Sequence, residues 1–200
     1  MSRNIFAGIF YSTLYIPEKR KGCIKMKTNK ITKTGILASA AFILQVIGSF
    51  AGIKVAGFLE IEISDFPAII ASFAYGPFFG VMVEFIKNLL HCTMSSTGFV
   101  GELANFLING SFVFTLGAVY KKNRTKSGAV LSLFAGGIVL VITAIFANLY
   151  ILLPLYLNGA DFSTKLNLVL CTITPFNAAR AVVLGILTML SYKKLRIFFK

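Results

Sequence analysis

The chain has 200 residues, of which 56% are hydrophobic and only 14% are charged, and its formal net charge is +13. A soluble domain carries about 25% charged residues, so this chain has too little polar surface to coat a water-soluble globule. The basic residues gather at 19–33, 121–126 and 193–200, beside long apolar runs. Juxtamembrane lysines are distributed in this way, which argues against nucleic-acid binding and for a lipid bilayer as partner.

Several kinds of site have no signature in the sequence. Cys23, Cys92 and Cys171 show no CxxC spacing, so we expect neither a disulfide framework nor a thiolate metal site. The chain has one histidine and no HExxH motif, which argues against an intramembrane zinc protease, and it has no P-loop for ATP hydrolysis. We therefore predict no catalytic residue, no metal and no cofactor.

Residues 1–33 differ in composition from the rest. The apolar stretch 5–16 is short, and most of the positive charge follows it, which is the opposite of a signal peptide. We expect 1–33 to be a cytoplasmic N-terminal extension, poorly packed or disordered, and we keep a short amphipathic surface anchor as the alternative. Met26 is a candidate translation start within it.

Six apolar segments follow and predict an all-α integral membrane protein. A helix needs about 20 apolar residues to cross the hydrocarbon, and we expect helices at 34–51, 67–75, 78–92, 100–120, 129–155 and 166–192. Gly76-Pro77 marks a tight turn, and the helix before it is short or tilted. Residues 34–194 then form a six-helix transmembrane domain, and 195–200 form a basic cytoplasmic tail.

The charge asymmetry predicts the topology. With both termini in the cytoplasm, the basic loop 121–128 is also cytoplasmic, as the positive-inside rule requires. The outer segments 53–66, 93–99 and 157–165 then contain four of the acidic residues, Glu60, Glu62, Asp65 and Asp161.

The first outer segment alternates apolar and polar residues from Leu59 to Ser64. This pattern predicts a short extended piece. It forms either a lid over the outer mouth or an ordinary surface loop.

Polar side chains recur on single faces of the predicted helices. Ionisable groups cost at least roughly 2.5–3.5 kcal/mol each at the centre of a membrane helix, so they usually face an interior cavity and serve function. Pro175 can loosen the last helix just before two of these residues. The predicted substrate-binding residues are Glu84, Lys87, Asn88, Asn105, Asn109, Asn148, Asn177 and Arg180.

The predicted topology places this whole set in the outer half of the membrane, which indicates a pocket open to the outside. His91 and Glu102, near the interface, are expected to be solvated. The alternative is that the amides join helices by hydrogen bonds and that Glu84 and Lys87 form a structural pair. A pocket with amides, few cations and many aromatics suits a planar, largely neutral molecule with several hydrogen-bonding groups.

The chain also resembles a known family. From about residue 34 to 194, it is similar to the riboflavin-specific substrate-binding (S) component of energy-coupling factor (ECF) transporters. The resemblance is carried, in order, by Phe-Leu-Glu-Ile-Glu-Ile-Ser-Asp-Phe-Pro at 58–67, Tyr-Gly-Pro at 75–77, Val-Glu-Phe-Ile-Lys-Asn-Leu-Leu-His at 83–91, Thr-Gly at 97–98, Gly-Glu-Leu-Ala-Asn-Phe at 101–106, the stretch 148–156 and Pro-Phe-Asn at 175–177.

This resemblance implies a protein of the bacterial cytoplasmic membrane that captures riboflavin in its outer half. The implied partners are an ECF transmembrane coupling protein and two ABC ATPase subunits, which supply the energy. It further implies that Asn148, Asn177 and Arg180 contact the ligand, with Glu84 and the outer loop nearby. The family usually has lysine where Arg180 stands.

The resemblance also implies that small residues four apart on the first helix dock the coupling protein. Thr34–Ala38 and Gly35–Ser39 have this spacing here. We predict a transporter subunit without enzymatic activity. The alternatives are an S component for another vitamin or a purine-like compound, a stand-alone secondary transporter with Glu84 as proton carrier, and a membrane enzyme.

Overall fold

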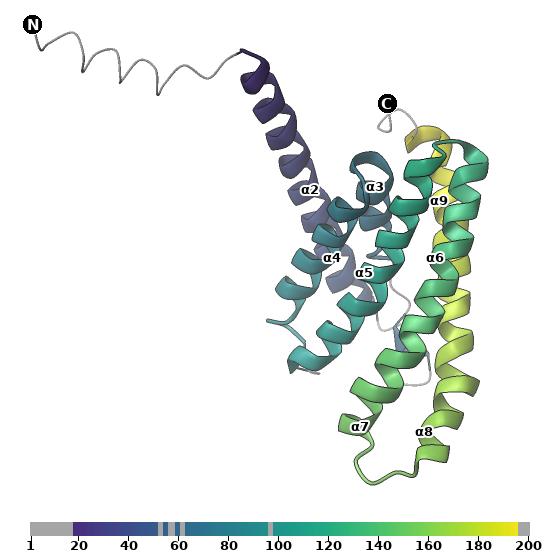
Figure 1. Cartoon of the computed structure of the whole chain (residues 1–200). Coiled ribbons are helices and arrows are strands. Elements are labelled where there is room, and N and C mark those ends of the chain that lie inside the picture. Colours follow the sequence, from purple (N-terminus) through teal and green to yellow (C-terminus); the bar gives the residue numbers. More distant parts are fainter. Residues whose placement is uncertain (1–17, 52–53, 56–58, 61–62, 96–97, 196–200) are drawn as a thin grey trace, which may run out of the picture. The chain divides into compact units, whose positions relative to one another are not determined.

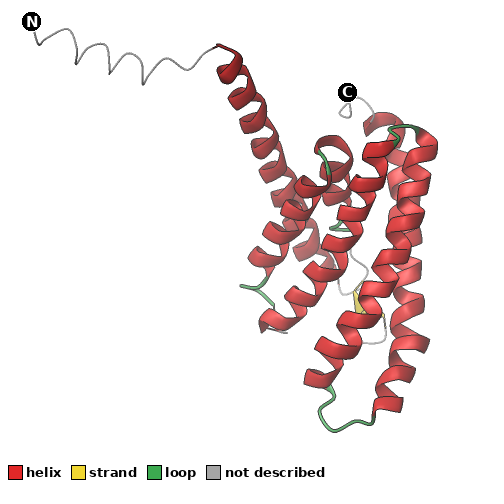
Figure 2. Cartoon of the chain, in the orientation of Figure 1, coloured by secondary structure: helices red, strands yellow, loops and turns green. Residues whose placement is uncertain are grey.

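A computed structural model describes residues 18–51, 54–55, 59–60, 63–95 and 98–195 of the chain. It divides the chain into two units, Met1–Lys33 and Thr34–Lys200, and the contacts given below lie within the second. In chain order the elements are α2 (Glu18–Ala51), β1 (Lys54–Val55), β2 (Leu59–Glu60), α3 (Phe66–Tyr75), α4 (Pro77–His91), α5 (Gly98–Lys122), α6 (Lys126–Ala147), the π-helix η1 (Asn148–Leu152), α7 (Leu153–Tyr156), α8 (Phe162–Leu168), the π-helix η2 (Val169–Ile173) and α9 (Thr174–Leu195) (Figures 1 and 2).

The predicted all-α class is confirmed. In the part of the chain that the structure describes, the strands are the two-residue β1 and β2, which pair antiparallel with Lys54 opposite Glu60. Four helices are long and apolar enough to cross a membrane: Thr28–Phe50, Phe99–Lys122, Lys126–Tyr156 and Phe162–Tyr192. Helices α3 and α4 are shorter, so the count of six spans and the side on which the termini lie stay predictions.

Helix α2 begins at Glu18, well before the span predicted from residue 34. Lysine and glutamate form helices readily and no proline interrupts the stretch, so helical hydrogen bonding continues beyond the apolar segment. Among the α2 side chains whose exposure is described, from residue 28 on, residues 28–33 are exposed and Thr34 is the first that is buried. The predicted surface anchor at 5–16 lies outside the described residues, and the proposed domain boundaries stay a prediction.

The second half of the chain contains two helices that are each widened by a π turn. Each π segment ends two residues before a proline, Pro154 after η1 and Pro175 after η2. A proline cannot donate to the carbonyl four residues earlier and its ring collides with that carbonyl. A wider turn relieves the collision, as we expected for Pro175, and π turns occur frequently at functional sites.

The packing of α3 fixes its depth in the bundle. Its Ser72 Oγ donates to the Val113 carbonyl of α5 at 2.6 Å, and its Phe73 ring stacks on Tyr120 at 4.4 Å. The Tyr120 and Tyr192 hydroxyls are 2.9 Å apart, beside the basic loop 121–126. Because ten residues of helix span only about 15 Å, α3 is about half as long as a hydrocarbon layer about 30 Å thick.

Glycine allows this close packing. A Cβ atom on Gly117 would lie 2.8 Å from Cα of Pro77, and one on Gly136 would lie 2.8 Å from Cδ2 of Leu116. Small residues at such positions let membrane helices approach closely. We call this part the inner region, made of Ser72, Phe73, Val113, Gly117, Tyr120, Gly136 and Tyr192.

Candidate substrate-binding site

The centre of the bundle contains a buried carboxylate with two cationic partners. Asp65 is fully buried, and its Oδ1 lies 2.7 Å from Lys87 Nζ while its Oδ2 lies 2.6 Å from Arg180 Nη2. The sequence analysis placed Asp65 in the outer segment 53–66 and did not include it among the substrate-binding residues, whereas the structure buries it between two of them. Ser64 and Asp65 form the turn just before α3, and Pro67, the second residue of that helix, favours a helix start there. Asp65 therefore lies at the buried N-terminal end of α3.

A second carboxylate completes the charge balance. Lys87 Nζ also lies 2.8 Å from Glu84 Oε2, one turn earlier on α4, as the spacing predicted. The two cations, Lys87 and Arg180, therefore face two carboxylates, and the formal charges of the four groups cancel. Buried charges are tolerated in a membrane protein when they pair with one another inside the bundle.

Helices α4 and α5 align their polar faces. His91 Nδ1 lies 2.9 Å from Glu102 Oε1, and both side chains are largely buried. Our expectation that this pair is solvated is therefore wrong, because the two helix ends pack together and shield it. The helices run antiparallel, so the same register puts Asn105 level with Asn88.

Continuing one turn along the same register, Asn109 is level with Glu84. We call the resulting set the polar column. It consists of Asp65, Glu84, Lys87, Asn88, Asn105, Asn109 and Arg180.

The amides of this column leave acceptor atoms unused. Asn88 Nδ2 donates to the Glu84 carbonyl at 2.8 Å, and Asn109 Nδ2 donates to Asn105 Oδ1 at 2.6 Å. Three buried oxygens, Glu84 Oε1, Asn88 Oδ1 and Asn109 Oδ1, accept no hydrogen bond from any described residue. A buried acceptor left in this state costs about 1–3 kcal/mol, so a reason for keeping three of them is needed.

Two further predicted residues lie in η1 and α9. Asn148 and Asn177 are both buried, and their Nδ2 atoms donate to the carbonyls of Ala144 and Ile173 at 2.8 and 2.9 Å. Asn148 opens η1, and Asn177 donates to the last residue of η2. Each amide thus lies at the edge of a widened turn.

Asn148 and Asn177 lie level with different residues of the polar column. Ser111 Oγ donates to Thr143 Oγ1 at 3.1 Å. This fixes the register of α5 against α6 and brings Asn148 level with the turn between Asn105 and Asn109. Asn177 lies one turn before Arg180.

The structure therefore treats the eight predicted residues in three ways. It links Glu84, Lys87, Asn88 and Arg180 in one network through Asp65, it pairs Asn105 with Asn109, and it bonds Asn148 and Asn177 to their own helices. Within the described ranges, no group of three or more His, Cys, Asp or Glu side chains could hold a metal ion.

Sequence reasoning missed Asp65 as a member of the site. A signal was present: Lys87 and Arg180 with Glu84 leave one unbalanced positive charge in the membrane, and an unpaired buried charge is too costly to keep. An acid near the predicted helices was therefore needed, and Asp65 was a candidate because Ser64-Asp65-Phe66-Pro67 has the sequence of a helix start.

Comparisons with known proteins agree with this architecture. The family model for the ECF transporter substrate-specific component matches residues 29–192. The chain is 34% identical over 182 residues to the riboflavin transporter RibU of Staphylococcus aureus (strain TCH60), covering 88% of this chain and 96% of that protein. It is 33% identical over 183 residues to the riboflavin transporter FmnP of Bacillus subtilis (strain 168), covering 86% and 94%.

A solved structure, described as the S component of a bacterial ECF transporter, superposes with a TM-score of 0.73 at 30% identity and covers 87% of this chain and 99% of that chain. Together with the four membrane-capable helices, these relatives make the chain a multi-pass protein of a bacterial membrane. The chain belongs to the family of substrate-specific components of ECF transporters.

Proposed function

We propose that this protein binds riboflavin from outside the cell and delivers it to the cytoplasm as the S component of an ECF transporter. The relatives named as riboflavin transporters support this substrate, because the similarity extends over most of both chains. The protein performs no chemistry on its ligand in this proposal.

The observation that carries the proposal is the set of unused acceptors beside a charge-balanced network. Glu84 Oε1, Asn88 Oδ1 and Asn109 Oδ1 are buried on facing helices and accept no bond from the described residues. Riboflavin has a planar ring with an N–H group and a ribityl chain with hydroxyl donors. A neutral ligand of this kind can satisfy buried acceptors without adding charge to a network whose charges already cancel.

The roles of the remaining site residues follow from their positions. Asn148 and Asn177 keep their carbonyl oxygens available because only their Nδ2 atoms are engaged with their own helices. Arg180, held by Asp65, presents a planar guanidinium whose further N–H groups are donors for ring carbonyls. We propose that these three residues contact the flavin ring.

The energy for release comes from partners in this proposal. An ECF coupling protein and two ABC ATPase subunits would bind the chain, which crosses the membrane six times with both termini in the cytoplasm. Of the two small-residue pairs on α2, Thr34 and Ala38 are buried, whereas Gly35 and Ser39 are exposed. The Gly35–Ser39 face is therefore our proposed docking face for the coupling protein.

The test is an absorption spectrum of the full chain purified in detergent without added ligand. We expect a yellow preparation with the two flavin bands, which releases riboflavin on denaturation at close to one molecule per chain. Asn177→Ala and Arg180→Ala should weaken riboflavin binding, and Asn158→Ala, in an exposed outer turn, is the matched control.

A colourless preparation that also fails to quench the fluorescence of added riboflavin would contradict the substrate. Screening other vitamins and purines would then identify the cargo of the same site. Riboflavin uptake by vesicles that contain the chain but lack the ATPase module would contradict the proposed energy source and favour a secondary transporter.

A further inference from the structure

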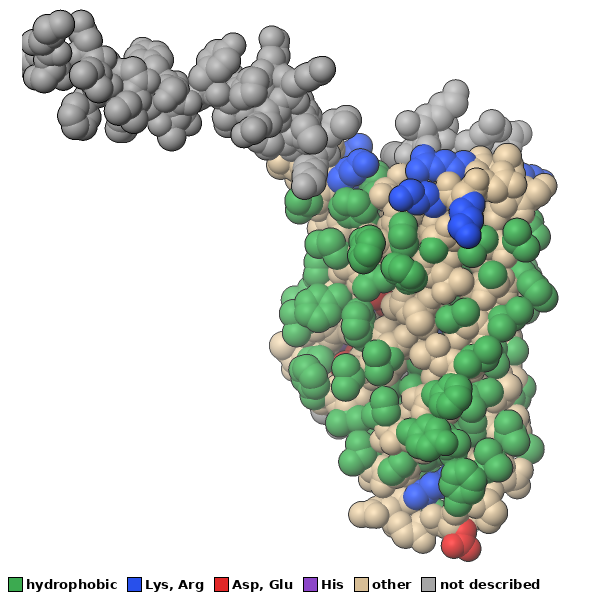
Figure 3. Space-filling model, in the orientation of Figure 1, with side chains coloured by type: hydrophobic (Ala, Val, Ile, Leu, Met, Phe, Trp, Pro, Cys, Tyr) green, Lys and Arg blue, Asp and Glu red, His purple; other side chains and the backbone are tan. Residues whose placement is uncertain are grey.

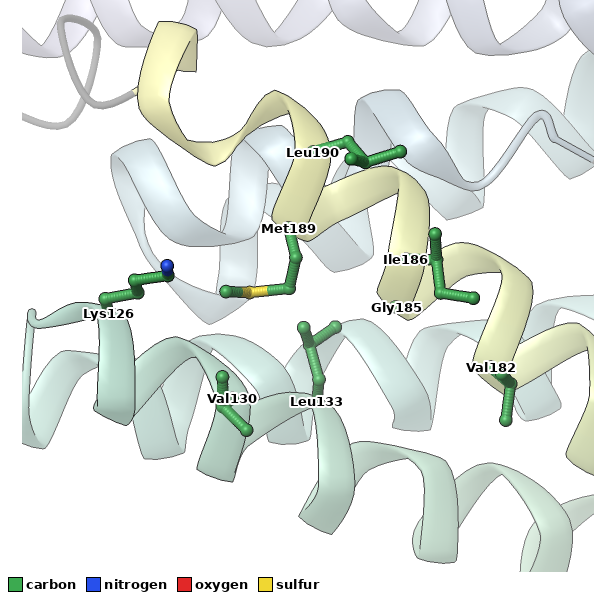
Figure 4. A pocket seen from close by; sticks show the side chains of 8 residues that line it. All are labelled: Lys126, Val130, Leu133, Val182, Gly185, Ile186, Met189 and Leu190. Carbon is green, nitrogen blue, oxygen red and sulfur yellow. The ribbon is translucent and has the colours of Figure 1, made fainter.

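An apolar groove lies between α6 and α9, apart from the polar column. Its volume is about 420 Å³. Figure 4 shows side chains of both helices facing each other across it. Its lining includes Lys126, Val130, Leu133, Gly185, Ile186 and Met189.

The groove has a fixed floor and exposed walls. Leu133 and Met189 pack against the buried core and form the floor. Val130 and Ile186 stand at the sides with 51% and 54% of their surface exposed. A Cβ atom added to Gly185 would meet no other atom within 4 Å, so the absence of a side chain there leaves real space.

An apolar surface of a multi-pass protein faces hydrocarbon rather than water. A groove of this kind is therefore filled by lipid, because an empty space gives up the dispersion contacts that an acyl chain supplies. The lining residues on α9 run from Val182 to Leu190, a helix length of about 12 Å, which is enough for part of one extended acyl chain.

Basic side chains at one end of the groove favour a lipid with an anionic headgroup. Lys126, the first residue of α6, lies at the end of the groove nearest Met189 (Figure 4). The exposed side chains of Lys121 and Lys122 at the end of α5, and of Arg124 in the turn that follows, precede it. The sequence has no acidic residue between Glu102 and Asp161. Within the described part of the chain, none of these four cations forms an ion pair, and Figure 3 shows basic side chains gathered at this end of the helices.

We propose that the α6–α9 groove is a binding site for an anionic phospholipid, with one acyl chain along Gly185 and the phosphate at Lys126. The site is independent of the substrate pocket. A lipid bound in this site anchors the end of the bundle with the basic residues 121–126 to the surrounding membrane leaflet.

The test uses the full chain in detergent with an equal mixture of phosphatidylglycerol and phosphatidylcholine of the same acyl composition, and bound lipids are counted by native mass spectrometry. We expect retention of phosphatidylglycerol to exceed that of phosphatidylcholine by roughly fivefold or more, since basic side chains attract anionic lipid by about this factor each. Lys126→Gln should reduce this preference, and Gly185→Leu should remove both lipids.

Matched controls are available at equivalent positions. Gly48→Leu adds a side chain to α2 where a Cβ also meets nothing within 4 Å, and Lys165→Gln removes a cation from α8, far along the chain from the groove. Both should retain lipid as the unchanged chain does. Thermal unfolding checks that each variant is folded, and Val130→Trp blocks the other wall if Gly185→Leu does not fold.

Equal retention of the two lipids by the unchanged chain would overturn the proposal. So would unaltered lipid retention in both Gly185→Leu and Val130→Trp. If these variants instead lost a co-purifying protein while lipid retention stayed constant, the groove would be a protein-docking surface and the lipid assignment would be wrong.

Discussion

The inner region and the polar column share helices α5 and α9 but use polar groups in different ways. In the inner region the Ser72 hydroxyl donates to a carbonyl and the hydroxyls of Tyr120 and Tyr192 bond to each other. In the polar column, buried oxygens of Glu84, Asn88 and Asn109 accept nothing from the described residues. Buried acceptors without a donor lower stability, so we assign the polar column to the proposed ligand and the inner region to the scaffold.

The contrast also predicts different consequences of mutation. Changes in the inner region should lower stability and leave ligand affinity unchanged in the folded fraction. Changes in the polar column should alter affinity, and they should lower stability only where a charge loses its partner. The four predictions below test this division, from the largest expected effect to the smallest.

The largest effect is expected from Asp65→Asn. Lys87 and Arg180 would then each lose the ion pair with Asp65, and removing one partner of a buried ion pair typically costs about 3–5 kcal/mol. Thermal or denaturant unfolding in detergent measures the loss, with the exposed Asp161→Asn as control.

The double variant of Asp65→Asn with Arg180→Gln provides a sharper version of this test. It restores charge balance, so it should be more stable than Asp65→Asn alone, with a coupling energy well outside experimental error. If the two losses simply added, Asp65 and Arg180 would not form the interaction described here.

Gly117→Ala should have the next largest effect. Its new Cβ would lie 2.8 Å from the Pro77 backbone, and overpacking of this kind costs about 1–3 kcal/mol. Riboflavin affinity, measured by fluorescence quenching on the folded protein, should stay the same. Gly48→Ala is the control, because its Cβ enters open space and alanine favours the helix. A large change in affinity in Gly117→Ala would contradict the division into two regions.

Asn88→Ala and Asn109→Ala should affect binding more than stability. Each removes a buried acceptor that we assign to the ligand, and one lost hydrogen bond of about 1–1.5 kcal/mol corresponds to roughly tenfold weaker riboflavin binding. Isothermal titration or fluorescence quenching gives the affinity, and Asn158→Ala is the exposed control. Unchanged affinity in both variants would return these amides to a purely structural role.

The smallest effect is expected at the pair of His91 and Glu102, one turn beyond the polar column. His91 and Glu102 form a largely buried pair at 2.9 Å near the ends of α4 and α5, and one hydrogen-bonded contact of this kind contributes about 0.5–1.5 kcal/mol. A double-mutant cycle of His91→Gln and Glu102→Gln, read by thermal unfolding, measures this coupling. A coupling energy as large as that of Asp65 with Arg180 would show that the pair outside the column stabilises the protein as much as the pair at its centre.

Much of the fold follows from one-dimensional patterns. Apolar length predicts three continuous helices to within a few residues, Phe99–Lys122, Lys126–Tyr156 and Phe162–Tyr192, since hydrocarbon thickness sets the length of a span. Gly76-Pro77 predicts the break between α3 and α4, because glycine takes the positive φ of 113° that this turn requires. The early start of α2 was missed because nothing in apolar length says where a helix ends outside the membrane.

The site was predictable in part. Spacing along a single helix correctly predicts that Glu84 and Lys87 pair, because residues three apart lie on one face. It cannot say that His91 meets Glu102 or that Asp65 meets Arg180, because those contacts depend on how separate elements dock.

The sequence by itself determined that this protein is an all-α membrane protein with polar groups gathered on a few helix faces, since hydropathy and periodicity are properties of single segments. The tertiary structure alone decided that Asp65 turns inward to balance Lys87 and Arg180. The α6–α9 groove with its open space at Gly185 is likewise visible only in the tertiary structure. Both depend on where distant segments meet, and no local pattern encodes that.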